Sequence, residues 1–190
     1  MRLVVPAREH LPEYEAALRR GWSPDNVRLD LAIAEQLAAI AADADGFLAG
    51  LDDPEARGGP IPLPDGSTVP RLPGFRRWMW HDGFCGSIGF RWQPGSADLP
   101  AHVLGHIGYA VVPWRRREGI ATRALALLLD EVRPRGLPHV ELTTDPGNIA
   151  SQRVIQANGG VLVERFHKAA YGEGESMRWR IALVPEERAS

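Results

Sequence analysis

The stretch from Tyr109 to Ala121 constrains the fold of this chain most, because it reads as a strand, a basic loop and a helix in immediate succession. Pro113 ends the apolar strand, since proline cannot donate to a strand ladder. Gly119 closes the loop and lets the backbone approach a ligand, because glycine has no Cβ. The first N–H groups of the helix lack intrahelical partners, and the helix dipole adds positive charge there. Three arginines at 115–117 add positive charge, so the stretch predicts a turn that binds a pyrophosphate. The alternative is an ordinary basic loop exposed to solvent.

The residues that follow alternate between helix and strand patterns, which favours an α/β or α+β sheet with helices on its faces. An apolar helix is expected over about 117–132, and a strand over 139–144. Asn148 is a good N-cap for a helix over 149–158, which the glycines at 159–160 end. The ranges 161–166 and 177–183 predict a terminal hairpin.

Arg116, Gly119 and Ala121 match the pattern Arg/Gln-x-x-Gly-x-Gly/Ala. This is the acyl-CoA signature of the GNAT superfamily of N-acyltransferases, which the chain resembles from Phe75 to Leu183, most specifically from Gly105 to Gly160. The resemblance implies a mixed, mostly antiparallel central sheet flanked by helices, with two central strands splayed apart to admit the pantetheine arm. We expect residues 1–190 to form one N-acetyltransferase domain. Its variable N-terminal part would cover 1–74, and its acyl-CoA-binding core 75–184.

The resemblance also implies acetyl-CoA as the co-substrate and assigns its contacts. Backbone N–H groups near Val111 and Val112 would hold the acetyl carbonyl and the pantetheine. The pyrophosphate would be held by the backbone of Arg116, Arg117, Gly119, Ile120 and Ala121. The hydroxyl of Thr122 could add a donor or bond to its own helix. Asn148 and Ser151 match the start of the family's second cofactor helix, where Asn148 could be an N-cap, a cofactor contact or both.

Two departures from the family pattern remove its usual acid and base. The position of the frequent tyrosine acid is Ile155, and the position of a glutamate found in some members is Gly105. The remaining candidates are His106, Glu141 and Tyr171. Each has an alternative role: a hydrogen-bonded structural histidine, a paired strand carboxylate and an exposed loop tyrosine.

The N-terminal half is less specific. We expect a helix capped by Asp25 or Asn26, and a hairpin around 82–83. The apolar face of that helix would comprise Leu29, Ile33, Leu37 and Ile40. One face of the second hairpin strand would comprise Phe84, Gly86, Ile88, Phe90 and Trp92. The range 52–74 has six prolines and four glycines in 23 residues, so it cannot be a regular element. It is either an ordered flap near the acceptor pocket or a mobile surface loop.

Composition narrows the class of protein. The chain has 190 residues, 44% of them apolar, and a net charge of −2, which gives no general attraction to nucleic acid. Cys85 is the only cysteine, so no intrachain disulfide can form, and core packing is its expected role. No signal peptide or membrane-spanning run is recognisable, and we expect a cytoplasmic protein without a metal.

The leading interpretation is an N-acetyltransferase that moves an acetyl group to an amine of a small molecule or peptide, by direct attack in a ternary complex. A homodimer would be common in such a family. The missing acid and base favour the alternative of a non-catalytic acyl-CoA-binding module. A nucleotide-binding domain ranks last, because the loop lacks the Gly-Lys-Ser/Thr of a P-loop. Trp114 could stack on an arginine or shield the thioester.

Overall fold

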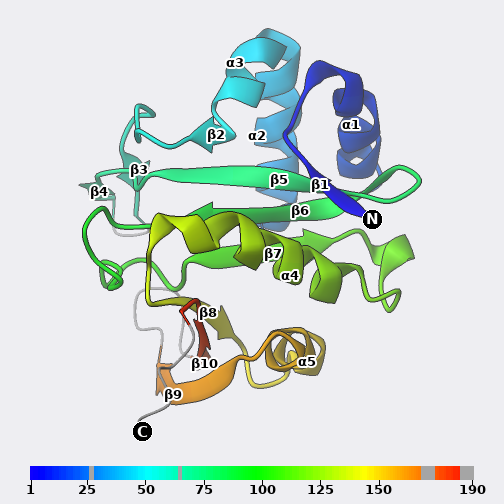
Figure 1. Ribbon diagram of the computed structural model, residues 1–190. Helices are drawn as coiled ribbons and strands as arrows, with labels where there is room; N and C mark the ends of the chain where they lie inside the picture. Colours follow the sequence, from blue (N-terminus) through cyan, green and yellow to red (C-terminus); the bar gives the residue numbers. More distant parts are fainter. Residues whose placement is uncertain (26–27, 64–65, 168–173, 185–190) are drawn as a thin grey trace, which may run out of the picture.

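The computed structural model describes residues 1–25, 28–63, 66–167 and 174–184, and its strands form antiparallel sheets (Figure 1). The first sheet has the order β1 (Arg2–Val4), β5 (Gly74–Trp80), β6 (Phe84–Arg91) and β7 (Ile107–Val111), and β2 (Asp52–Asp53) also pairs with β5. The second sheet has the order β8 (His139–Thr144), β10 (Glu175–Ala182) and β9 (Val161–His167). A small hairpin joins β3 (Ile61–Pro62) to β4 (Thr68–Val69).

Helices cover both faces of the first sheet. They are α1 (Leu11–Arg19), α2 (Leu29–Ala42), α3 (Ala44–Ala49), α4 (Ile120–Val132) and α5 (Ile149–Ala157), with 3-10 turns at Arg8–His10, Pro113–Arg115 and Arg133–Arg135. In Figure 1, α4 crosses the front of the first sheet and α2 passes behind it. Alternation along β5 explains the two cores: Met79 packs on the α4 side, while Trp78 packs on the side of α1.

The two sheets meet between β7 and β8 without sharing a strand ladder among the described residues. They are joined at one end, which we call the seam. There the His106 N–H donates to the Glu141 carbonyl at 2.8 Å, and the Thr143 hydroxyl donates to the Leu104 carbonyl. Beyond the seam, β7 pairs with β6 and β8 pairs with β10. The antiparallel sheets flanked by helices confirm the predicted α/β fold class. The interval between β7 and β8, called here the strand gap, matches the predicted splaying of two central strands, although every described strand pair is antiparallel.

The prediction for β6 is wrong at its start. Phe84 packs in the α1-side cluster, whereas Ile88 and Phe90 pack in the α4-side cluster. The cause is a β-bulge: Met79 pairs with Gly86 and Trp80 with Phe84, so Cys85 is an extra residue that reverses the alternation. Cys85 itself is fully buried, as predicted.

The prediction for the second helix needs a similar correction. α2 begins at Leu29, with Arg28 at the N-cap and no side-chain cap bond. The Asp25 carboxylate instead accepts the Arg28 N–H at 3.0 Å just before the helix, and Asn26 lies outside the described residues. Leu29 is 56% exposed and does not belong to the buried face. Ile33, Leu37 and Ile40 pack against the α1-side cluster as predicted, and Ala32 is also buried.

Candidate functional site

The outer edge of β7 faces the strand gap. His106 and Val112 bond to β6, since the His106 carbonyl accepts from Arg91 N–H at 2.9 Å and the Val112 N–H donates to the Cys85 carbonyl at 3.0 Å. Because bonding direction alternates along a strand, the backbone groups of Tyr109 and Val111 point away from β6. Of the two predicted backbone donors, Val111 therefore lies on the strand gap, whereas the Val112 N–H is already engaged within the sheet.

The N-terminus of α4 follows β7 after one short loop. Gly119 is its N-cap with φ +74°, and no side chain caps the helix. The first helical bond runs from Arg123 N–H to the Gly119 carbonyl. The preceding N–H groups, at Ile120, Ala121 and Thr122, therefore have neither an intrahelical partner nor a side-chain cap. This is the geometry that binds an anion.

The arginines of the loop have different surroundings. Arg115 is held by Glu118 at 2.9 Å and by the His81 carbonyl at 3.0 Å. Arg116 and Arg117 are exposed beside the α4 N-terminus, and Arg116 makes one long bond of 3.4 Å to the Val111 carbonyl. Of the two roles predicted for Trp114, stacking on an arginine and shielding the thioester, the structure shows the first. The partner is Arg20, at the end of α1, whose guanidinium carbon lies 3.7 Å from the ring centroid.

The start of α5 lies on the other side of the strand gap. Asn148 caps this helix by accepting the Ser151 N–H at 3.1 Å. The Ser151 hydroxyl lies 2.6 Å from the Tyr109 hydroxyl, so a side chain of β7 reaches the first turn of α5. Ile155, one turn further along, is fully buried. The structure thus brings the predicted contacts on β7 and α5 to opposite sides of one gap.

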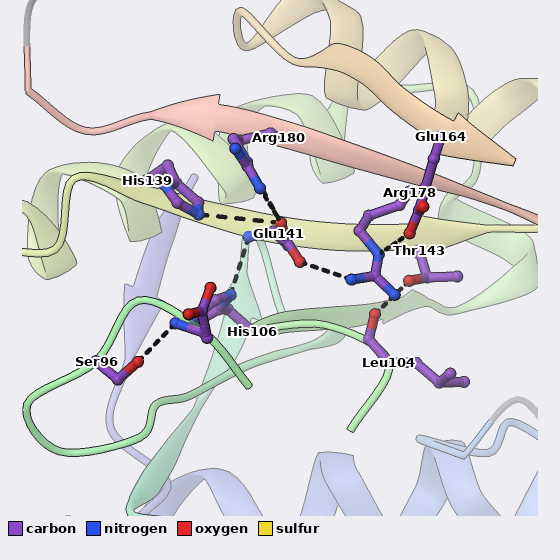
Figure 2. A network of polar contacts seen from close by, with 10 residues as sticks. Ser96, Leu104, His106, His139, Glu141, Thr143, Glu164, Arg178 and Arg180 are labelled. Atoms are coloured by element: carbon purple, nitrogen blue, oxygen red, sulfur yellow. Dashed lines mark hydrogen bonds and ion pairs between the residues drawn. The ribbon is translucent and has the colours of Figure 1, made fainter. Parts of the chain in front are cut away.

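Glu141 belongs to a polar network on the face of the second sheet that points away from α4 (Figure 2). Its neighbours Val140 and Leu142 are buried in the α4-side core, so Glu141 points to the other face. It accepts from Arg180 at 2.7 Å and from Arg178 at 3.4 Å, and His139 lies 3.9 Å away. The carboxylate is therefore paired, which matches the structural alternative for this residue.

His106 is fully buried at the seam. Its Nδ1 accepts the Glu141 N–H at 3.0 Å, so in the neutral ring the proton is placed on Nε2. Burial lowers the pKa of His106 to about 4. The neutral ring then has no free lone pair for a substrate proton, and this geometry favours the structural role of His106 over catalysis. The third candidate, Tyr171, lies outside the described residues.

A pocket of about 290 Å³ opens beside this network. It is lined on one side by Glu141, Arg178 and Arg180 of the second sheet. The other lining residues come from the loop before β7 and are Asp98, Leu99, Pro100, Ala101 and Val103. Residues 52–74 are not among its lining residues, so the described part of that segment does not act as a flap on this pocket.

Sequence reasoning missed Asp98, Arg178 and Arg180. The alternation of Arg178 and Arg180 with buried Met177, Trp179 and Ile181 was a usable signal that both arginines share a polar face. Within the described ranges, no group of three or more His, Cys, Asp or Glu side chains could hold a metal ion. No helix in the same ranges is long and apolar enough to cross a membrane.

Comparisons with known proteins agree with the fold described above. A family model described as an acetyltransferase (GNAT) domain matches residues 37–161 of the 190. No curated protein sequence matches the chain. Among solved structures, the chain is similar to RimL, a ribosomal L7/L12 alpha-N-protein acetyltransferase in complex with coenzyme A, with 13% identity, a TM-score of 0.61 and coverage of 95% of this chain and 92% of RimL.

Two further structures show the same fold. The microcin C7 self-immunity acetyltransferase MccE, in complex with acetyl-CoA and AMP, is 13% identical with a TM-score of 0.57, covering 95% of this chain and 91% of MccE. The ribosomal-protein-S18-alanine N-acetyltransferase from Escherichia coli is 13% identical with a TM-score of 0.55, covering 100% of this chain and 97% of that enzyme. At this level of identity, the likeness establishes the fold.

Proposed function

Because the chain belongs to the GNAT family of acetyltransferases, we propose that it transfers an acetyl group from acetyl-CoA to a primary amine of a small molecule or peptide. The observation that carries this proposal is the uncapped N-terminus of α4 directly after a strand with a free edge. RimL and the S18-alanine enzyme are both named for N-acetylation of ribosomal proteins, which supports an amine acceptor.

The proposed binding mode for acetyl-CoA uses the residues around the strand gap. The N–H groups of Ile120, Ala121 and Thr122 bind the pyrophosphate, and the exposed Arg116 and Arg117 add positive charge. The pantetheine passes between β7 and α5. The Val111 N–H holds the thioester carbonyl and stabilises the oxyanion that develops when the amine attacks.

The acceptor amine approaches from the opposite face, through the pocket beside Glu141. An alkylamine has a pKa of about 10.4, so roughly one molecule in 2,000 is neutral at pH 7. Glu141 is paired with arginines and His106 has no free lone pair, so neither takes the amine proton in this proposal. In this proposal Asp98, an exposed carboxylate that lines the pocket, accepts that proton.

Isothermal titration with acetyl-CoA tests the binding site. Gly119→Trp places a bulky side chain on the turn. Gly136→Trp is a matched control, because Gly136 also has φ +74°, has open space around its Cβ position and lies beyond the other end of α4. We expect binding by the wild type and by Gly136→Trp, and its loss in Gly119→Trp. Equal loss in both variants, or no binding by the wild type, would contradict the assigned site.

A second assay measures turnover. Release of free CoA thiol is followed with short peptides and small primary amines as acceptors. Thiol release that depends on an amine supports the transferase. Acetyl-CoA binding without release across the whole panel would support the non-catalytic module instead, which the engaged states of Glu141 and His106 favour.

A further inference from the structure

Tyr109 spans the strand gap from β7 to α5. Its hydroxyl lies 2.6 Å from the Ser151 hydroxyl and 3.4 Å from the Ser151 carbonyl. The side chain is only half-buried, although it packs against the α4-side core. A hydroxyl is thus held in place at the point where a ligand between β7 and α5 has to pass.

In the proposed binding mode, the reacting end of the thioester comes close to this hydroxyl. Tyr109 and Val111 are two residues apart on β7, so their side chains share a face and their N–H groups share the free edge. Ser151 is in the first turn of α5, which Asn148 caps. The phenol therefore lies between the edge assigned to the acetyl carbonyl and the helix assigned to the pantetheine.

We propose that the Tyr109 hydroxyl donates a hydrogen bond to the sulfur of CoA as the thiolate leaves. This inference rests on the proposed function. In the step, the amine nitrogen bonds to the carbonyl carbon, the C–S bond breaks and its electron pair stays on sulfur. Asp98 has by then taken the first proton of the ammonium, so the second proton on nitrogen goes to water, and Tyr109 keeps its own proton. Ser151 positions the phenol by its hydrogen bond.

The acidity of the two groups supports a hydrogen bond over a full proton transfer. Burial raises the pKa of Tyr109 above the ordinary value of 10, and the bond to Ser151 only partly opposes this shift. A free thiol has a pKa of about 8.5. The phenol is therefore the weaker acid, and it stabilises the thiolate by donating to it.

The test needs no acceptor amine. Isothermal titration at pH 7 and pH 9.5 compares CoA with desulfo-CoA, which lacks the sulfur. In the ratio of the two affinities, pH effects that do not involve the sulfur cancel. The proteins are the wild type, Tyr109→Phe and the control Tyr14→Phe. Tyr14, like Tyr109, has a hydrogen-bonded hydroxyl, but it is fully buried and packs among the α1-side residues. Circular dichroism verifies that each variant is folded.

We expect CoA to bind the wild type and Tyr14→Phe roughly tenfold more tightly at pH 9.5 than at pH 7, relative to desulfo-CoA, because a bond to a charged group favours the thiolate. Tyr109→Phe should lose this pH-dependent preference while still binding desulfo-CoA with wild-type affinity. The same preference in Tyr109→Phe, or none in the wild type, would overturn the role of Tyr109. Failure of the wild type to bind either ligand would instead overturn the proposed function.

Discussion

Replacing His106 by asparagine should remove a large acid sensitivity from this protein. The buried ring is neutral in the folded state, with a pKa of about 4, against an ordinary value of 6.5. Burial is the main cause. His139 and Arg91 lower this pKa further, while Glu141 and Asp98 oppose the shift. Asparagine keeps an oxygen that can accept the Glu141 N–H but does not titrate.

The magnitude follows from linkage between protonation and folding. Above pH 6.5, the histidine is neutral in both the folded and the unfolded chain. Below pH 6.5, His106 is protonated in the unfolded chain but stays neutral in the folded chain until about pH 4. The unfolded state therefore binds more protons in this range, and the free energy of unfolding falls as the pH falls. A pKa difference of about 2.5 corresponds to roughly 3 kcal/mol.

Urea unfolding at several values between pH 7 and pH 4 measures this effect. The wild type should lose roughly 3 kcal/mol relative to His106→Asn across that range, because the contributions of other groups cancel in the difference. His167→Asn removes an exposed histidine of β9 and reports the effect of losing a surface imidazole. Parallel profiles for the wild type and His106→Asn would refute the assignment of a buried neutral ring.

Three other substitutions test the fold and the loop. Gly105→Ala should lower the free energy of unfolding by about 1–3 kcal/mol in the same urea assay, because a Cβ there would lie 3.0 Å from the Glu141 carbonyl oxygen. Gly59→Ala is the control and should stay near wild type, because a Cβ at that position has no neighbouring atom within 4 Å. Equal stability of the two variants would contradict a close approach of the strands at Gly105. Cys85→Ser should retain amine-dependent thiol release, since the buried thiol, whose pKa burial raises, is not an acyl carrier; loss of turnover in a folded variant would contradict this. Trp114→Ala should raise the KM for acetyl-CoA about two- to fivefold, as expected from losing an exposed cation–π contact with Arg20; an unchanged KM would show that this contact does not support the cofactor loop.

Local patterns in the sequence were sufficient for the elements around the strand gap. The order of strand, basic loop and helix predicted β7 and α4, and Asn148 predicted the start of α5. These features depend on neighbours in the chain, such as a cap, a helix-ending glycine or an apolar period. The main error on β6 arose because one extra residue, Cys85, reverses the alternation without any sign in composition.

Long-range pairing limited what could be predicted of the site itself. The pairing of Glu141 with Arg180 depends on β8 and β10 lying side by side, although 39 positions separate the two residues. The loss of the Val112 N–H to Cys85 similarly depends on sheet register. Residue types therefore indicated the candidates, but only the fold could distinguish a paired carboxylate or an engaged donor from a free one.

The seam between the two sheets also gives the strand gap a closed end. β7 and β8 are joined at the seam and are unpaired beyond it, so the gap between them is narrowest at the seam. Gly105 lies at the narrow end, where a Cβ would come within 3.0 Å of the facing backbone. A larger residue at position 105 would force β7 and β8 apart at the seam and so widen the narrow end of the strand gap. The lack of a side chain at Gly105 thus allows β7 and β8 to stay close together at the seam.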